Sequence, residues 1–444
     1  MATKNDLIEA QNFSRRRLLT AFVSGAPGGK ELEPAAPLRA VFAAIALTAA
    51  VLLVGVFWGL IQPGLPNGWQ NGRLVLAKDT GARYVSIEGA LHPVINTASA
   101  RLLIPSSDFA VISTDQNTLA GVPLDSTLGI VGAPDSLPSP SNLIGDGWTA
   151  CVADDAGTDV RIATDAAASA TRDAAVVEAS GALFVVAGEQ RFAVDPTQSD
   201  AVLRAAGITS LDPAPVSASW LNLFTPGADL SPIVVTNAGL PLEGSALSIG
   251  DVVHIGGDPE DVRYVILDDG TLAELTPLAW QLYQLGSGQN TGTVSEVTAA
   301  EARALPTARQ PAGGADWPRA GFTSIDTTTR ACALLTHDAQ GAHTVLATQP
   351  TTDAATAGVR VQAGHGALVA AGGRGDQSTA MLTLVDATGT AYALPGATEE
   401  TIKRLGYDPD ADVGSAGQDW IALLASGPAL TEAAAGTTPG TAAQ

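Results

Sequence analysis

The sequence predicts a mixed α+β protein with an N-terminal amphipathic helix, a single transmembrane helix and an elongated extracytoplasmic body. Three observations support this fold class: an uncharged stretch from Ala40 to Gly72, a strand-strand-helix pattern that recurs along the chain, and two cysteines at corresponding places in two similar halves. The chain has 444 residues, 46% of them hydrophobic, which is enough apolar sequence to form several cores. Its formal net charge of −22 argues against nucleic-acid binding, because that binding depends on Lys and Arg neutralising phosphates.

Residues 1–39 form a basic leader. They carry six cations and four anions, a net charge of +2, so the rest of the chain carries −24. Apolar residues alternate here with charged ones and predict a roughly amphipathic helix that ends at Gly25; they are Leu7, Ile8, Phe13, Leu18, Leu19 and Phe22. The helix could lie on the anionic inner leaflet or dock on the cytoplasmic face of a partner. The cations Arg15, Arg16, Arg17 and Arg39 could equally serve only to set the topology.

A single transmembrane helix is predicted at 40–61. The 22 residues from Ala40 to Ile61 carry no charge, and at about 1.5 Å per residue they reach about 33 Å, enough for a hydrocarbon core of about 30 Å. Trp58 suits an interfacial aromatic, and Pro63 would end the helix. A buried core helix and a cleaved signal peptide are the alternatives, although the long leader and long apolar run are untypical of a signal peptide. The basic flank predicts a cytoplasmic leader and an acidic body outside the membrane.

A small ββα unit recurs in the body. It is found at 173–235, where three short strands precede a helix and a later tryptophan, and again at 376–430, where two short strands, a helix and a tryptophan follow in the same order. Further copies are predicted at 73–110 and 236–295. Each unit has too little core to stand alone, so it must pack on its neighbours.

The spacing of residues taken as equivalent predicts two similar halves. Tyr84 and Tyr264 are 180 residues apart, and the two cysteines are 181 apart. Phe184 and Tyr392, also taken as equivalent, are 208 apart, which leaves about 27 extra residues in the second half. Each half would run repeat, insert with one cysteine, repeat, so that the halves are related by pseudo-twofold symmetry.

The two inserts, 111–172 and 296–375, are predicted to pair in one central, mainly β domain. Pairing would bring Cys151 and Cys332 together, and the inferred oxidising compartment favours a disulfide between them. In the chain-entropy model, closing so long a loop contributes roughly 4 to 5 kcal/mol. Two separately buried thiols are the alternative. The tail 431–444, rich in Ala, Thr and Gly, is predicted to be disordered.

The most specific signal lies between residues 78 and 102. It consists of Lys78-Asp79-Thr80-Gly81-Ala82-Arg83-Tyr84, Leu91-His92-Pro93-Val94-Ile95-Asn96 and Ala98-Ser99-Ala100-Arg101-Leu102. Together with Phe13-Ser14-Arg15-Arg16-Arg17, Trp69, Gly129-Ile130-Val131-Gly132-Ala133-Pro134-Asp135 and the Trp148-x-x-Cys151 pair, these motifs closely resemble the EccB family of the actinobacterial type VII (ESX) secretion system. The likeness covers essentially the whole chain before the tail.

The resemblance implies a structural and gating subunit of an inner-membrane protein secretion complex. Its periplasmic domain, four repeats around a disulfide-tied centre, would associate with itself around the substrate exit path. The implied partners are the motor ATPase EccC, the channel subunit EccD, EccE and the mycosin protease. The motif residues are expected to have structural roles; they are Thr80, Gly81, Arg83, Tyr84, His92, Pro93, Asn96, Ser99 and Arg101.

Reactive side chains are not concentrated in this sequence, which predicts no catalytic residue, metal or cofactor. His337 and His343 are six residues apart, not at the i, i+4 spacing of a zinc-binding helix. Some members of the family are labelled ATPases, but the nearest approach to a phosphate loop has Ser24 in place of its first glycine and Glu31 after its lysine. The competing function is a cell-wall (peptidoglycan) binder in which Trp69, Trp280 or Trp317 stacks on sugars. A membrane-tethered hydrolase would need a cleft with perturbed titratable groups.

Overall fold

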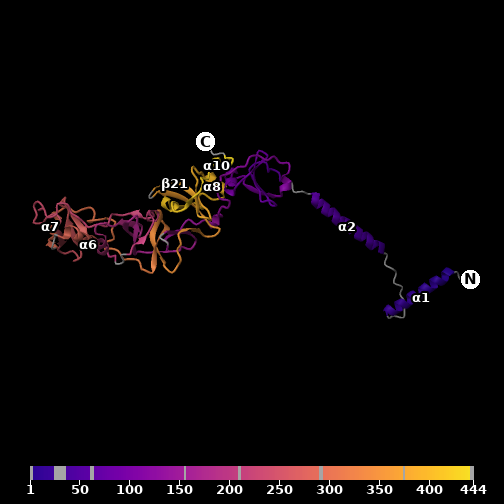
Figure 1. Ribbon diagram of the computed structural model, residues 1–444, viewed down its shortest axis with the longest axis horizontal. Coiled ribbons are helices and arrows are strands. Elements are labelled where there is room, and N and C mark those ends of the chain that lie inside the picture. Colours follow the sequence, from indigo (N-terminus) through magenta and orange to yellow (C-terminus); the bar gives the residue numbers. More distant parts are fainter. Residues whose placement is uncertain are drawn as a thin grey trace. The chain divides into compact units, whose positions relative to one another are not determined.

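The computed structural model describes residues 4–24, 37–60, 65–154, 157–208, 212–289, 294–373 and 376–440 (Figure 1). It divides into two units, Met1–Gly64 and Leu65–Gln444. We describe each unit by itself.

The first unit contains two helices, α1 (Lys4–Ser24) and α2 (Pro37–Leu60). The stretch Leu38–Val56 of α2 is long and apolar enough to cross a membrane, and none of it is buried inside the protein. This exposure argues against the buried-core alternative, because a core helix would be covered by other side chains. The predicted anchor extends to Ile61, which lies outside the described residues, as do Gly25 and the side chain of Trp58.

The second unit contains five sheets. The first sheet consists of β1 (Arg73–Ala77), β2 (Arg83–Ile87), β3 (Ala90–Pro93) and β4 (Ala110–Thr114). The second consists of β8 (Ala174–Ala179), β9 (Ala182–Ala187), β10 (Gln190–Ala193), β11 (Ala214–Pro215) and β12 (Thr225–Pro226). The third consists of β13 (Val252–Ile255), β14 (Arg263–Ile266), β15 (Leu272–Leu275) and β16 (Ser295–Val297). The fourth consists of β20 (Ala367–Gly373), β21 (Asp376–Val385), β22 (Thr390–Ala393), β23 (Gly414–Gly417) and β24 (Ala425–Ser426).

The fifth is the central sheet, with β5 (Thr149–Val152), β6 (Thr158–Ile162), β7 (Ser169–Ala170), β17 (Thr329–Asp338), β18 (Gly341–Pro350) and β19 (Gly358–Val361). The helices of this unit are short, and they are α3 (Thr97–Leu103), α4 (Ser199–Ala205), α5 (Ala218–Leu221), α6 (Pro277–Leu285), α7 (Ala299–Arg303), α8 (Glu399–Leu405), α9 (Gln418–Ile421) and α10 (Glu432–Ala435).

The first four sheets share one order of elements. Three antiparallel strands are followed by a helix and by a strand that returns parallel to the first, as β4 does beside β1. In the second and fourth sheets another short helix leads to a fifth strand, parallel to the third. The ββα pattern read from the sequence therefore lacks the returning strand in every unit, and it lacks the first strand in every unit except 173–235. The sheets also run past the predicted boundaries: β4 and β16 extend beyond residues 110 and 295, and β20 begins before 376.

One equivalence assumed in the sequence is corrected by the strand order. Phe184 lies in the second strand of its sheet, β9, whereas Tyr392 lies in the third strand, β22. The residue that corresponds to Tyr392 is Phe192 in β10, 200 positions earlier. The packing supports this pairing, because a Cβ on Gly227 would collide with the ring of Phe192, and a Cβ on Gly427 would collide with the ring of Tyr392.

The central sheet is built from both inserts. Its strand order is β19-β6-β5-β17-β18-β7, so β6 and β5 of the first insert lie between β19 and β17 of the second, and β7 of the first pairs with β18 of the second. In the pairing of β5 with β17, Cys151 lies opposite Cys332, and the two are joined by a disulfide. Three successive residues of β17, Ala331, Cys332 and Ala333, are buried, so this part of the strand is covered on both faces.

Three buried tryptophans join the central sheet to its neighbours. Trp148 and Trp420 meet edge to face with ring centroids 6.2 Å apart. The indole of Trp220 donates a hydrogen bond to the carbonyl oxygen of Ala150 in β5 (2.8 Å), and that of Trp420 donates to Thr344 in β18 (2.8 Å). One apolar core therefore includes residues of the second, central and fourth sheets.

The C-terminal tail was predicted to be disordered, but its described part, residues 431–440, contains the helix α10. Thr431 accepts a hydrogen bond from the Ala434 N–H and caps α10. Ala435 is fully buried and belongs to the core of the fourth sheet. Residues 441–444 lie outside the described residues.

Candidate functional site

The motif residues lie in and around the first sheet. Gly81, at a φ of 75°, closes the turn between β1 and β2, where the Thr80 hydroxyl accepts a hydrogen bond from the Ala82 N–H (3.3 Å). Tyr84 donates from its hydroxyl to the side chain of Gln116 (3.2 Å). His92 and Pro93, in β3, contact the following loop: the His92 Nδ1 lies 3.1 Å from the Ser126 carbonyl oxygen, and the Pro93 carbonyl accepts from the Leu128 N–H.

Asn96 and Ser99 connect α3 to the loop at 128–135. The Asn96 side chain accepts a hydrogen bond from the Ser99 N–H (2.9 Å) and donates one to the Ile130 carbonyl oxygen (2.7 Å). The Ser99 hydroxyl accepts from the Ile130 N–H (2.9 Å). Both residues are buried, so these bonds satisfy polar groups that water cannot reach. Gly129 has a φ of 135°, and a Cβ there would meet Ile95.

Two arginines complete this region. Arg83 forms an ion pair with Asp135, and the hydrogen bonds from Arg83 hold the pKa of Asp135 below its ordinary value. The Arg101 guanidinium lies over the ring of Phe109, 3.8 Å from its centroid, and burial lowers the pKa of Arg101.

A network of charges joins α3 to the C-terminal helices. Arg404 in α8 donates to the Leu102 carbonyl oxygen (2.7 Å) and forms ion pairs with Glu400 (3.1 Å) and Glu432 (3.0 Å). Glu400 in turn accepts from the N–H and the hydroxyl of Ser106 (2.9 and 2.8 Å). Figure 1 accordingly shows α8 and α10 beside the first sheet. The motif thus belongs to a joint, made by α3, α8 and α10, between the beginning and the end of the second unit.

The other predicted site residues belong to other elements of the chain. Arg15, Arg16 and Arg17 are exposed on α1, and Arg39 is exposed in the first turn of α2, next to Ala40. The disulfide lies in the central sheet among small apolar residues.

A polar contact among His337, Asp146 and Ser415 was missed in the sequence because the three residues come from distant segments. The Nδ1 of His337 lies 3.1 Å from a carboxylate oxygen of Asp146, and its Nε2 lies 3.0 Å from the carbonyl and 3.1 Å from the hydroxyl oxygen of Ser415. A Ser, His and Asp in contact resemble a hydrolase triad, but here the imidazole also faces a backbone carbonyl, which competes with the hydroxyl for Nε2. We regard it as a tie between β17 and β23.

Among the described residues there is no group of three or more His, Cys, Asp or Glu placed to hold a metal ion. Asp269 accepts hydrogen bonds from the N–H and hydroxyl of Thr271, as expected of a turn residue. Asp154 pairs with Arg330, and its neighbour Asp155 lies outside the described residues.

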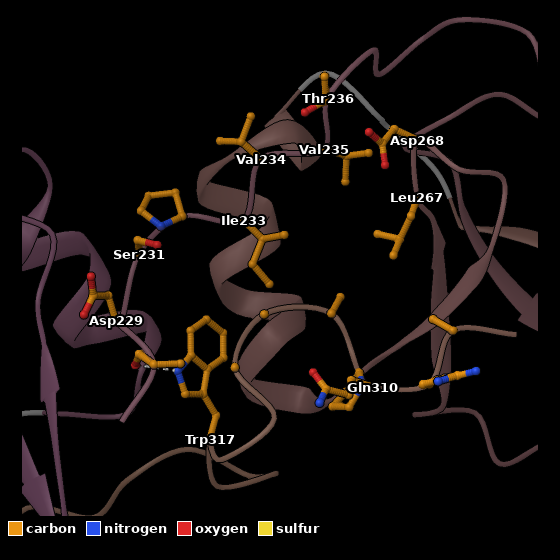
Figure 2. Close-up of a pocket in the computed structure, with 18 residues that line it drawn as sticks. Asp229, Ser231, Ile233, Val234, Val235, Thr236, Leu267, Asp268, Gln310 and Trp317 are labelled. Carbon is orange, nitrogen blue, oxygen red and sulfur yellow. Dashed lines mark hydrogen bonds between the residues drawn. The ribbon is translucent and has the colours of Figure 1, made fainter. Parts of the chain in front are cut away.

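A cleft of about 850 Å³ lies between the second and third sheets (Figure 2). Ile233, Leu267 and Trp317 present apolar groups to it, and Asp229 and Asp268 stand on opposite sides. Trp317 is only 8% exposed, and its indole donates to the Ala228 carbonyl oxygen (3.0 Å). The glycines in the stretch at 306–318 let the chain pass close to Trp317, since a Cβ on Gly313 or Gly314 would collide with its indole.

Comparison with known proteins identifies the family. A family model described as "Type VII secretion system ESX-1, transport TM domain B" matches residues 1–444. The chain belongs to the EccB family. Two relatives from Mycobacterium tuberculosis are named "ESX-5 secretion system ATPase EccB5", 30% identical over 291 residues, and "ESX-1 secretion system ATPase EccB1", 31% identical over 260 residues. These alignments cover 59% and 53% of this chain, and 55% and 52% of the relatives, so the chain spans about half the length of the curated EccB proteins it matches.

Chains of solved ESX complexes share the fold. A chain of "an intact ESX-5 inner membrane complex" is similar with a TM-score of 0.66 and 22% identity, over 100% of this chain and 97% of that one. A chain of the "EccB3 dimer from the ESX-3 core complex" is similar with a TM-score of 0.66 and 22% identity, over 82% of this chain and 99% of that one.

Proposed function

We propose that this EccB-family chain is a structural subunit of the inner-membrane complex of a type VII (ESX) secretion system. The observation that carries the proposal is that one family model covers the leader, the apolar helix and the sheet-rich body together. In this arrangement the leader is cytoplasmic, α2 is the single membrane pass and residues 65–444 form the periplasmic part.

The proposed mechanism is mechanical. The periplasmic part associates with further copies of itself, surrounds the substrate exit path and gates it. One similar structure is an EccB3 dimer, which supports self-association of that protein, and another is part of an ESX-5 inner membrane complex. The strand β4 offers a suitable surface here, because it is an edge strand and Val111 on it is 54% exposed. EccC, EccD, EccE and the mycosin protease are the proposed partners.

We also propose that the four smaller sheets are copies of one repeat arranged in two pseudo-twofold halves. Their shared order of elements supports this, as does the matching contact of Gly227 with Phe192 and of Gly427 with Tyr392. Four rigid units joined by short connections would suit a wall around an exit path.

Affinity purification of the tagged full chain from its own membranes in mild detergent tests the assembly. We expect EccC, EccD and EccE in the eluate by mass spectrometry, together with a second, differently tagged copy of the chain. A matched version without residues 1–39 should lose the partner that docks on the leader but keep the second copy. Recovery of the full chain by itself would remove the basis of the proposal.

Two other functions have less support. A cell-wall binder would need exposed aromatic faces, but Trp317 is nearly buried, Trp69 and Trp280 are half-buried, and Trp280 stacks against Tyr283. An ATPase, as the relatives are named, would require that purified full chain hydrolyse ATP at a rate abolished by a point change within this chain. Retention of the full chain on purified peptidoglycan would favour the binder.

A further inference from the structure

The cleft in Figure 2 has the features of a peptide-binding groove. One wall is the segment Ser231–Thr236, which runs past the end of α6. The N–H of Ile233 donates to the Leu282 carbonyl oxygen (3.1 Å), and its carbonyl accepts from the Ser287 N–H (3.0 Å). The Val235 N–H donates to the Ser287 hydroxyl (2.9 Å). These hydrogen bonds hold the segment Ser231–Thr236 against the end of α6 and use the backbone groups on that side.

Val234 lies between Ile233 and Val235. Unlike them, it is exposed, with 73% of its surface accessible, and neither its N–H nor its carbonyl is hydrogen-bonded to any described residue. Successive residues of an extended segment direct their backbone groups to opposite sides, so the free groups of Val234 face away from α6. An extended peptide can pair with such an edge by β-augmentation.

The opposite wall is the stretch at 306–312. It is fixed to β15 by bonds from the Ala308 N–H to Leu272 (2.8 Å) and from the Ala312 N–H to Glu274 (2.9 Å). In the described part of the chain, the intervening backbone N–H groups of Arg309 and Gln310 have no hydrogen-bond partner. Both walls are therefore anchored from behind and have free backbone groups.

The floor and the rim limit what can bind. Ile233 and Leu267, both half-buried, would accommodate one aliphatic or aromatic side chain. Asp229 and Asp268 are exposed and form no ion pair with any described residue, and they outnumber Arg309, the one cation among the residues that line the cleft, so a second cation can approach them. The chain's own tail does not fit this charge pattern, because residues 431–444 contain no Lys or Arg.

We propose that this cleft binds an extended, basic peptide segment of a partner protein. The peptide pairs with the backbone of Val234, places one apolar side chain against Ile233 and Leu267, and directs a Lys or Arg to Asp229 or Asp268. This inference does not depend on the proposed assembly of the secretion complex.

Fluorescence anisotropy with purified full chain in detergent tests the proposal. The probe is a fluorescein-labelled nonapeptide of alternating lysine and valine. Two matched peptides serve as controls: one has glutamate in place of lysine, and one keeps the lysines but has proline at two central valine positions, which removes backbone donors. We expect the first to bind at least about tenfold more weakly and the second about fivefold more weakly.

Variants of the chain locate the site. Val234→Pro should weaken binding about fivefold by removing a backbone donor, whereas Val234→Ala keeps the donor and should have little effect. Asp229→Asn with Asp268→Asn should weaken binding about threefold or more, and more so at low salt. Asp165→Asn, an exposed carboxylate outside the cleft, is the matched control and should change nothing.

Absence of binding at millimolar peptide, equal binding of the acidic peptide, or binding unaffected by Val234→Pro and by the aspartate pair would each overturn the proposal. Loss of retention on purified peptidoglycan in the same variants would overturn it as well, because the cleft would then be a glycan site. A thermal melt of every variant shows that it is folded.

Discussion

At the scale of single residues, the disulfide is the feature with the largest expected effect on stability. It joins neighbouring strands whose cysteines are 181 positions apart in the sequence. Without it, the unfolded chain would have a higher conformational entropy, which favours unfolding. Cys151→Ala with Cys332→Ala should lower the free energy of unfolding by up to roughly 4 to 5 kcal/mol, and with it the Tm of the full chain.

The control for this prediction is reduction. Wild-type chain melted in strong reductant should approach the Tm of the alanine pair, and the pair itself should not respond to reductant. Alanine is preferred to serine because both cysteines are buried among alanines, where a lone hydroxyl would lack a partner. Equal melting of oxidised and reduced wild type would contradict the prediction.

The ion pair between Arg83 and Asp135 should make stability depend on pH. The pKa of Asp135 is lowered mainly by its hydrogen bond with Arg83, so the contribution is complete above the ordinary pKa of an aspartate, near 4, and is lost as pH falls through the lowered value. Because Asp135 is more than half exposed, Asp135→Asn should cost only about 0.2 to 1 kcal/mol at pH 7. Denaturant unfolding at pH 7 and at pH 2.5 measures this, and the difference from wild type should shrink at low pH. Asp165→Asn should show no effect at either pH.

At the scale of elements, α3 depends on its cap. Asn96→Ala removes both the acceptor for the Ser99 N–H and the donor to Ile130, and should destabilise the full chain by about 1 to 2 kcal/mol. Asn96→Asp keeps the acceptor and should lose less. Asn117→Ala, at an exposed asparagine that makes no side-chain hydrogen bond with described residues, is the control. If Asn96→Ala and Asn117→Ala unfold at the same denaturant concentration, the joint around α3 does not rest on this cap.

The elements that the sequence predicted best are those with a local signal. The helix at 40–61 follows from an uncharged run and is found as Pro37–Leu60. The returning strands could not be predicted from the sequence. The strand β4 is mostly exposed, so its residues show no alternating apolar pattern. Its partner β1 is distant in the sequence, with β2, β3 and α3 between them. The tail was misjudged from composition, since Ala435 packs into a core that also contains Leu102, Leu368 and Tyr392, all more than 40 positions away.

The candidate site was predictable in part. Family motifs indicated the residues around α3, but not that Asn96 and Ser99 bond to Ile130 or that Arg404 reaches Leu102, because both contacts join distant segments. The cleft forms because Val234 and the stretch at 306–312, which are far apart in the sequence, lie on its two sides. No local sequence pattern indicates that these segments are close in space.

At the scale of the whole molecule, the second unit is tied together by contacts between its ends and its middle. Trp220 and Trp420, which are 200 positions apart, both donate hydrogen bonds to strands of the central sheet. The Arg404 network then joins the last helices to the first sheet. Such ties at long sequence separation make this unit suited to act as one structural piece rather than as a string of independent repeats.

The topology proposed for the chain gives the last prediction. A leader of charge +2 and a remainder of −24 flank one apolar helix, so Ser14 should be cytoplasmic and Asn117 should lie outside. Both side chains are exposed, and the native cysteines are oxidised, so Ser14→Cys and Asn117→Cys each introduce one reactive thiol. In intact spheroplasts a membrane-impermeant maleimide should label Asn117→Cys and not Ser14→Cys, whereas detergent lysis should allow both to be labelled. Labelling of Ser14→Cys before lysis, with Asn117→Cys protected, would reverse the orientation and place the acidic body in the cytoplasm.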